Sequence, residues 1–317
     1  MEAHYDDAAN LQTTGMAPAL QAAITAQYAL SFQVIRQLSG GEECAIWLVR
    51  SEQGLLVVRM SPRWRSLTRL GWAHALMRAT QPLLPVVIAP LQAPTGSTLF
   101  VHQEHPVALF PYVDGHHLDR EDAAQRGAAA RLLAHLHRAL LTASVPYAPF
   151  VRHLREAPGA PCSEDPASLR DADLDTWHAA LVRRPDALTC GPIHGDYYRR
   201  NLLVSRGAIS ALLDWDDAHH DFLMQEVAWS AWEFAKTPSG DDWHRERART
   251  FVQAYRAAGG PCHEDEYSLL LPFIRWRLRE EVRYNLAAAA VGERWDPEYV
   301  DKEVHAFQRL HGHTFAI

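Results

Sequence analysis

The sequence predicts an α+β protein with two lobes, in which an antiparallel sheet with one helix precedes a larger, mostly helical lobe. Three strand-like segments separated by tight turns fall within residues 32–60, and helical periodicity dominates from residue 116 onward. One further strand pair is expected inside the helical lobe, at residues 202–213. The expected domains are an N-terminal extension with a helix at 1–30, a first lobe at 31–108, a linker at 109–115 and a second lobe at 116–317.

The composition is that of a globular protein long enough for two lobes. The chain has 317 residues, of which 48% are hydrophobic and 22% are charged. Its formal net charge of −7 argues against nucleic acid or an anionic membrane as a partner. The four cysteines include no CxxC pair, and no segment approaches the length needed to span a membrane. We therefore expect a cytoplasmic protein without a membrane partner.

The first lobe is expected to contain an antiparallel meander. Phe32 to Leu38, Cys44 to Arg50 and Leu55 to Met60 have the composition of strands, and short polar or glycine-containing turns separate them. Apolar residues at helical spacing predict a helix from Ser66 to Ala79. The other elements expected before the linker are a helix at Ala17 to Leu30 and strands at Val86 to Leu91 and Leu99 to Gln103.

Two features of this meander suit a phosphate group. Ser39, Gly40 and Gly41 form a turn whose backbone can approach a phosphate closely, although a plain hairpin loop has the same composition. Arg59 is a cation on an otherwise apolar strand, and its guanidinium can hold phosphate oxygens in a fork. The alternative for Arg59 is an arginine on an edge strand that faces water.

The segment from Ala108 to Gly115 is apolar, extended and ends in Asp-Gly, as expected for a linker between lobes. An adenine ring held there needs one backbone acceptor and one backbone donor. Pro111 retains its C=O and Val113 offers an N–H, so this pair can serve an adenine. An ordinary strand between lobes is the alternative.

The second lobe carries its chemistry in the stretch His194 to Asp217, which has the pattern of a catalytic loop followed by a hairpin. Asp196 follows a tight His-Gly turn, Asn201 lies five positions later, and Asp214 ends the second strand of the hairpin. Phosphoryl transfer needs a group that accepts the proton of the attacking hydroxyl, and Asp196 suits that role. It also needs oxygen ligands for Mg²⁺, and the Asn201 amide oxygen and the Asp214 carboxylate suit that role.

Several helices are expected around this stretch, and one of them is a candidate substrate wall. Met224 to Ala235 carries Trp229 and Trp232 on one side and Glu226 and Glu233 on another. A core helix with solvated glutamates is the more common meaning of such a pattern. A cleft wall for a cationic substrate, with cation–π contacts to tryptophan, is the other. The remaining expected helices are Asp122 to Leu141, Ser168 to Val182, Asp242 to Ala258, Asp265 to Ala290 and Pro297 to Phe315.

The helix from Asp265 to Ala290 contains the basic run RWRLREEVR at 275–283. Arg275, Arg279 and Arg283 recur at a spacing of four residues, and acids stand between them. A solvated, salt-bridged helix face is the expected structure. A site for an acidic substrate is the alternative.

The motifs HGDYYRRN at 194–201 and LLDWDDA at 212–218 resemble those of the aminoglycoside phosphotransferase and choline kinase superfamily, the small-molecule relatives of protein kinases. The order of elements is similar too, from glycine turn and strand cation to linker, catalytic loop and metal-binding acid. The resemblance implies a protein-kinase-like fold, a nucleotide-binding first lobe, and ATP and Mg²⁺ as cofactors. One departure is that the helix from Ser66 to Ala79 lacks an acid to pair with the strand cation. Glu42, Glu43 and Glu104 are candidate replacements.

The resemblance implies that Asp196 is the catalytic base, that Asn201 and Asp214 hold Mg²⁺, and that Arg59 contacts the phosphates. The expected function is ATP-dependent phosphorylation of a hydroxyl on a small molecule, such as an antibiotic, homoserine, a choline-like alcohol or a sugar. The alternative is a catalytically weak nucleotide-binding module that regulates a partner. A protein kinase is disfavoured, because only about ten residues separate Asp214 from the next helix. Contacts to the substrate are expected from Asp216, Asp217, Glu226, Trp229 and Glu233.

Overall fold

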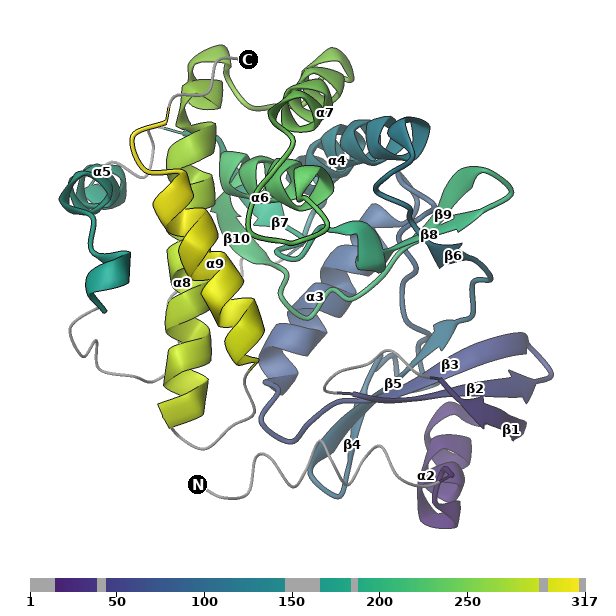
Figure 1. Ribbon diagram of the computed structural model, residues 1–317. Helices are drawn as coiled ribbons and strands as arrows, with labels where there is room; N and C mark the ends of the chain where they lie inside the picture. The colour runs from purple at the N-terminus through teal and green to yellow at the C-terminus, as the bar shows by residue number, and fades with distance from the viewer. Residues whose placement is uncertain (1–14, 39–43, 146–165, 184–187, 291–295, 314–317) are drawn as a thin grey trace. The chain divides into compact units, whose positions relative to one another are not determined.

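The computed structural model describes residues 15–38, 44–145, 166–183, 188–290 and 296–313. The chain divides into two compact units (Figure 1). The first comprises Met1–Gly115 with Ser144–Pro146, and the second comprises His116–Ala143 with Tyr147–Ile317. The predicted α+β composition is confirmed, since an antiparallel sheet forms the first unit and helices form most of the second.

The first unit is built on a five-stranded antiparallel sheet with the order β1-β2-β3-β5-β4. Its strands are β1 (Phe32–Gln37), β2 (Ala45–Ser51), β3 (Gly54–Met60), β4 (Phe100–His102) and β5 (His105–Pro111). The linker expected from residue 108 therefore begins as strand, because Ala108 to Pro111 pair with β3. The strand expected at Val86 to Leu91 is wrong. Pro85 precedes this segment and Pro90 lies within it, and a residue without an N–H cannot extend a strand ladder.

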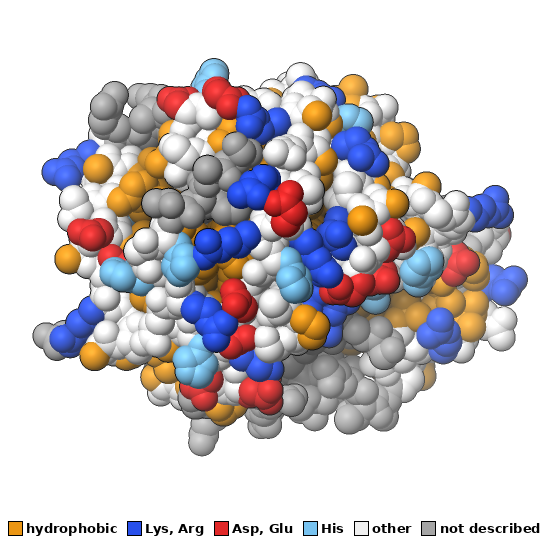
Figure 2. All heavy atoms as spheres, turned by 45° about the horizontal axis from the view of Figure 1, so that its top comes forward, with side chains coloured by type: hydrophobic (Ala, Val, Ile, Leu, Met, Phe, Trp, Pro, Cys, Tyr) orange, Lys and Arg blue, Asp and Glu red, His pale blue; other side chains and the backbone are white. Residues whose placement is uncertain are grey.

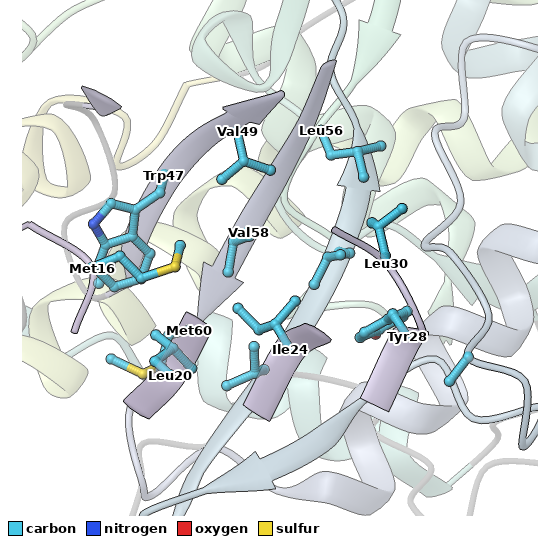
Figure 3. Packing of buried hydrophobic residues seen from close by; sticks show 14 residues of the cluster. Met16, Leu20, Ile24, Tyr28, Leu30, Trp47, Val49, Leu56, Val58 and Met60 are labelled. Carbon is cyan, nitrogen blue, oxygen red and sulfur yellow. The ribbon is translucent and has the colours of Figure 1, made fainter. Parts of the chain in front are cut away.

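The core of the first unit lies between the sheet and α2 (Pro18–Tyr28). Leu20, Ile24 and Tyr28 recur every four residues, so they share one face of the helix. Figure 3 shows these side chains packed against sheet residues that include Trp47 and Val58. The second helix, α3 (Leu67–Thr80), begins where the Ser66 hydroxyl accepts a hydrogen bond from the Arg69 N–H.

The second unit is centred on α6 (Leu223–Ala235), whose residues are buried at all but one position. It packs against α7 (Arg245–Ala257) and α8 (Leu270–Ala290), and α8 in turn packs against α9 (Pro297–Arg309) (Figure 1). The other helices of this unit are α4 (Ala123–Thr142), which also contacts α7, and α5 (Ala172–Arg183), which contacts α8. Short 3₁₀ turns at Ala167–Leu169, Arg199–Asn201 and Glu264–Leu269 complete the helical elements described.

Two small sheets hold the stretch that carries the motif. The predicted hairpin is present as β8 (Leu202–Ser205) and β9 (Ala208–Leu212), and β6 (His116–His117) adds a third strand to it. The segment after the motif forms the strand β10 (His219–Phe222), which pairs with β7 (Cys190–Ile193). Its sequence, HHDF, has no alternation of polar and apolar residues that would predict a strand.

The basic face of α8 is buried, so the expectation of a solvated face is wrong. Arg275 and Arg279 are 9% and 0% exposed. Their partners come from the chain that precedes and forms α5, because Arg275 pairs with Asp171 and Arg279 with Asp175. A helix that packs against neighbours on several sides can have a buried charged face. The sequence of the helix alone does not show this burial.

On the surface, basic and acidic side chains are interspersed. Figure 2 shows Lys and Arg beside Asp and Glu across the visible face. Ion pairs within single helices account for part of this arrangement, among them Arg249 with Glu246 and Lys302 with Glu298. None of the helices in the described ranges is both long enough and apolar enough to cross a membrane.

Candidate active site

The loop of residues 194–201 joins β7 to β8 and is fixed by hydrogen bonds at both ends. At its start, His194 is fully buried, and its Nε2 lies 2.9 Å from the carbonyl oxygen of Leu213. At its end, the N–H of Leu213 donates to the carbonyl of Asn201 over 2.8 Å. Both ends of the loop are therefore tied to the residue that immediately precedes Asp214.

Asp196 and Asn201 are in direct contact. The Nδ2 of Asn201 donates to the backbone oxygen of Asp196 over 2.8 Å and to its Oδ2 over 2.9 Å. Two oxygen acceptors identify the nitrogen of this amide, so its oxygen is the atom left to bind a cation. The same contacts hold the Asp196 carboxylate in one orientation. An amide oxygen is a ligand that suits Mg²⁺.

Asp214 lies two residues beyond the end of β9, and its side chain is exposed. Its backbone has a φ of 58°, which is uncommon for a residue other than glycine. The next residue, Trp215, is buried and donates its Nε1–H to the carbonyl of Leu212 over 3.2 Å. The chain thus turns sharply after the hairpin, and the turn presents the Asp214 carboxylate on the outside. Together with Asn201 it offers two oxygen ligands, which suits an ion that keeps water and phosphate as its other ligands.

The pKa of Asp196 is raised to about 7. Burial is the largest cause, and the negative charges of Asp217 and Asp214 add to it. The positive charge of Arg277 and the hydrogen bond from Asn201 act in the opposite direction. A carboxyl group with a pKa near neutrality is suited to accept a proton from a substrate hydroxyl and to release it again.

Gly195 allows the loop to turn tightly beside Asp217. Its φ is 84°, and a Cβ at this position would lie 2.2 Å from the backbone oxygen of Asp217. That oxygen also lies 2.6 Å from Nδ1 of His219 on β10. The close approach of the two backbones brings Asp217 near Asp196, which requires a residue without a side chain.

Glu226, expected at the substrate wall, lies instead beneath the catalytic loop. Its Oε1 accepts the N–H of Gly195 over 2.6 Å, and its Oε2 accepts the N–H of His194 over 3.2 Å. Nε2 of His137, on α4, lies 2.9 Å from the same Oε2. Burial raises the pKa of Glu226, but these hydrogen bonds lower it more, so the net pKa lies below its ordinary value. Glu226 is therefore arranged to position the loop and not to touch a substrate.

The other expected substrate residues lie in different environments. Asp216 is buried, and Trp229 is only 6% exposed. Glu233 forms an ion pair with Lys236, whose Nζ lies 2.6 Å from it. Trp229 also lines a small cavity next to Gly195 and Tyr197 of the catalytic loop.

Three residues of this region were missed from the sequence: His137, Lys236 and Arg277. His137 is 89 positions away from its partner Glu226, and a lone histidine on an apolar helix gives no signal of such a contact. Lys236 does carry a local signal, because it stands three and four residues after Glu233 and Trp232. Arg277 falls between the arginines that were expected to be solvated.

The residues expected to bind nucleotide lie in the first unit. Arg59 is in register with Ala108 of β5, and it lines a cavity with His74 of α3 and with Phe110. Pro111 is the last residue of β5 and pairs with Leu56. Val113 lies beyond the strand.

The remaining nucleotide-side expectations concern residues 39–43 and Glu104. Ser39, Gly40, Gly41, Glu42 and Glu43 lie outside the described residues. Glu104 lies 3.2 Å from Arg63 as an ion pair. His74, which shares the cavity with Arg59, is buried, and its Nδ1 lies 2.9 Å from the hydroxyl of Thr98.

A loop that presents Asp196 and Asn201, followed by a hairpin and then by Asp214, is the arrangement expected of a small-molecule kinase. Residues 34–273 match the phosphotransferase enzyme family, and the chain belongs to that family. Its members include the aminoglycoside phosphotransferases that the motifs resemble, and the chain is accordingly a phosphotransferase that acts on a hydroxyl-bearing small molecule.

Comparisons with individual proteins agree with this family. The chain is 29% identical over 281 residues to a homoserine kinase of Nitrobacter winogradskyi, with 84% of each chain covered. Its fold is similar to that of the amicoumacin kinase hAmiN, with a TM-score of 0.66, 13% identity, and 99% and 97% of the two chains covered. It is also similar to a choline/ethanolamine kinase family protein from Mesorhizobium loti, with a TM-score of 0.59, 16% identity, and 97% and 94% covered. The protein-kinase-like fold class is thereby confirmed.

Proposed function

We propose that this protein transfers the γ-phosphoryl group of ATP to a hydroxyl of a small molecule, with Mg²⁺ as the metal, and that homoserine is the first acceptor to test. The contact between Asp196 and Asn201 carries the proposal, because it orients a carboxylate as a base and leaves an amide oxygen for a cation. Homoserine comes first because the relative with 29% identity over 84% of this chain is a homoserine kinase.

In this proposal Asp196 orients the acceptor hydroxyl and takes its proton. Asn201 and Asp214 hold Mg²⁺, which neutralises phosphate charge when it is bound. Arg59 contacts the phosphates through its guanidinium. Pro111 and Val113 hold the adenine edge. Most of the rate enhancement comes from positioning and charge neutralisation, as in other phosphoryl transfers.

The test is ATP consumption, with and without Mg²⁺, in the presence of L-homoserine, choline, aminoglycosides and sugars. Asp196→Asn is expected to lower kcat by about 10²- to 10⁴-fold, the usual contribution of a general base. Asp214→Asn is expected to raise the Mg²⁺ concentration needed for half-maximal rate. Asp265→Asn, at an exposed position outside the site, is the matched control and is expected to behave like the native protein. Full activity of a folded Asp196→Asn variant would overturn the assignment of the base.

A further inference from the structure

One side of the catalytic loop is covered by α6 and α8, and Trp229 of α6 lies at the contact. Two cations lie near the Trp229 ring. The guanidinium carbon of Arg277 is 5.1 Å from the ring centroid, and Nζ of Lys236 is 5.4 Å from it. The helix face that could have formed a wall for a cationic substrate therefore already holds two positive charges of the chain itself.

Lys236 occupies a site that has the chemistry of an ammonium-binding cage. Its Nζ lies 5.7 Å and 5.9 Å from the ring centroids of Trp232 and Tyr299, in addition to Trp229. Glu233 and Glu303 approach the same nitrogen to 2.6 Å and 2.9 Å. Aromatic faces combined with carboxylates are what recognises an ammonium ligand. Since the lysine fills this cage, its acids and rings are not left for the ammonium of an acceptor.

Arg277 is a buried arginine of α8 and, like Arg275 and Arg279, has a guanidinium nitrogen without a hydrogen-bond partner. It is 4% exposed, and Glu281 is the carboxylate within ion-pair distance among the described residues, 2.6 Å from Nε. Nε of Arg277 is buried and has no hydrogen-bond partner, so its contact with Glu281 is an ion pair without hydrogen-bond geometry. Arg283, by contrast, donates to Glu280 over 2.6 Å. A buried guanidinium has five N–H groups to satisfy, and its planar fork matches a carboxylate.

Arg277 also faces the catalytic loop. It lines a cavity of about 10 Å³ together with Gly195 and Tyr197, the residues on either side of Asp196. A space of that size holds about one water-sized group, so one polar end of an acceptor would enter it and not the whole molecule. Gln225 lines the same cavity, is 2% exposed, and has an Oε1 without a hydrogen-bond partner. The cavity thus combines an arginine whose Nε lacks a hydrogen-bond partner with an amide oxygen that lacks a donor.

We propose that Arg277 is a specificity-determining residue of the acceptor site and binds a carboxylate of the alcohol that is phosphorylated. The inference rests on the proposed kinase function and adds the substrate class, which is a hydroxy acid or hydroxy amino acid. An alcohol whose only charge is an ammonium is disfavoured, because the ammonium cage is filled by Lys236.

The test compares L-homoserine with 3-aminopropan-1-ol, which is the same molecule without its carboxylate. The native protein is expected to have a higher kcat/KM for L-homoserine. Arg277→Gln is expected to raise the KM for L-homoserine by about 10- to 100-fold, as when charge-assisted hydrogen bonds are lost. The KM for 3-aminopropan-1-ol is expected to change less than about 3-fold, since it has no carboxylate to lose. Arg283→Gln, on the same helix and away from the cavity, is the matched control.

A second measurement needs no variant and so does not depend on whether Arg277→Gln folds. L-2-Aminobutyrate lacks the hydroxyl of homoserine but keeps the carboxylate, whereas propylamine lacks both. The first is expected to inhibit the native protein competitively against the acceptor, and the second is expected not to inhibit at the same concentration. Equal inhibition by both compounds overturns the inference.

The outcomes separate the two levels of the proposal. If no alcohol is phosphorylated by the native protein, the proposed kinase function fails and the inference fails with it. If alcohols are phosphorylated but L-homoserine is no better than 3-aminopropan-1-ol, the kinase function stands and the role of Arg277 is overturned. An equal effect of Arg277→Gln on both acceptors overturns it as well.

Discussion

Nε2 of His137 lies 2.9 Å from Oε2 of Glu226, and both side chains are buried. This contact joins α4 to α6 and continues through Glu226 to the backbone N–H groups of His194 and Gly195. On its other side, Nδ1 of His137 lies 2.8 Å from the hydroxyl of Tyr255 on α7. Three helices are thereby connected by hydrogen bonds to the loop that carries Asp196. The position of the loop that carries Asp196 is therefore fixed by side chains of α4, α6 and α7.

Glu226→Gln tests this arrangement. A glutamine has a single acceptor oxygen, so it cannot accept from both backbone amides and from His137. Each buried donor left without a partner costs about 1–3 kcal/mol, and the free energy of unfolding is expected to fall by at least that amount. The kcat is expected to fall more than the KM changes, because the loop that holds Asp196 is displaced. Urea unfolding and steady-state kinetics measure the two effects.

Glu246→Gln, an exposed acid that pairs with Arg249, is the control for a lost carboxylate and is expected to change neither quantity. A Glu226→Gln variant with native stability and native kcat would show that the loop does not depend on this carboxylate.

Gly195→Ala tests the close approach between the catalytic loop and Asp217. The new Cβ would lie 2.2 Å from the Asp217 oxygen, so one of the two backbones must move. We expect kcat to fall by about 10²-fold, the effect of misplacing a catalytic group by about 1 Å. Gly207→Ala is the matched control, because Gly207 also has a positive φ, 79°, but has no atom within 4 Å of the added carbon.

Gly207→Ala should therefore show only the cost of the left-handed backbone, about 1–2 kcal/mol of stability, with activity retained. Thermal unfolding and the rate of phosphoryl transfer distinguish the two variants. If both variants lose the same activity, the contact with Asp217 is not the reason for glycine at position 195.

The sequence predicted the elements whose signals are local. The hairpin around the turn at Ser205 to Gly207 follows from apolar runs on either side of a polar turn, and the helix α6 follows from its periodicity. Neither β7 nor β10 was predicted, because each has four residues and their pairing is defined only across the intervening loop and hairpin. Short strands gain their stability from pairing and burial and not from their own composition.

The site was predictable to the same extent. Asp196, Asn201 and Asp214 lie close together in sequence, so their spacing carries information. The contacts from His137 to Glu226 and from Lys236 to Glu303 span 89 and 67 positions, and no periodicity within a helix reports them. Burial is likewise a property of the assembled helices and is not visible in the sequence of one helix. The arginines of α8 were therefore predicted to face water.

Lys236→Ala tests whether the cage of acids and aromatic rings can bind a free ammonium ligand once the lysine side chain is removed. Removing the ammonium leaves Glu233 and Glu303 without their shared cation, and breaking a buried ion pair in this way costs about 3–5 kcal/mol. The free energy of unfolding is expected to fall accordingly. n-Propylammonium has nearly the length of the side chain that is removed, so it is expected to restore part of the lost thermal stability.

Two controls accompany this experiment: sodium chloride at the same concentration, and the native protein with n-propylammonium. Neither is expected to show the stabilisation, because sodium lacks the alkyl chain and the native cage is already filled. Equal stabilisation of variant and native protein would mean that Lys236 does not occupy a cage that an ammonium ligand can enter.

Glu303→Gln tests the charge of the same cluster through the pH dependence of stability. The pKa of Glu303 is raised to about 7, chiefly by burial and also by Glu233 of α6 and Glu281 of α8, while Lys236 acts to lower it. Oε2 of Glu303 has no hydrogen-bond partner, so a negative charge there is poorly compensated. The pKa in the unfolded chain is near 4.5, so the folded state binds the proton more tightly. The stability contributed by protonated Glu303 is therefore fully present below pH 4.5 and is lost as the pH rises through 7.

A glutamine at position 303 keeps the neutral form at every pH. The stability of Glu303→Gln relative to the native protein is therefore expected to increase between about pH 5 and pH 8, by up to about 3 kcal/mol. Urea unfolding at several pH values within this range measures the difference. If the free energy of unfolding changes with pH in the same way for the two proteins, Glu303 is ionised throughout this range. Lys236 then compensates the charges of Glu233 and Glu303 together.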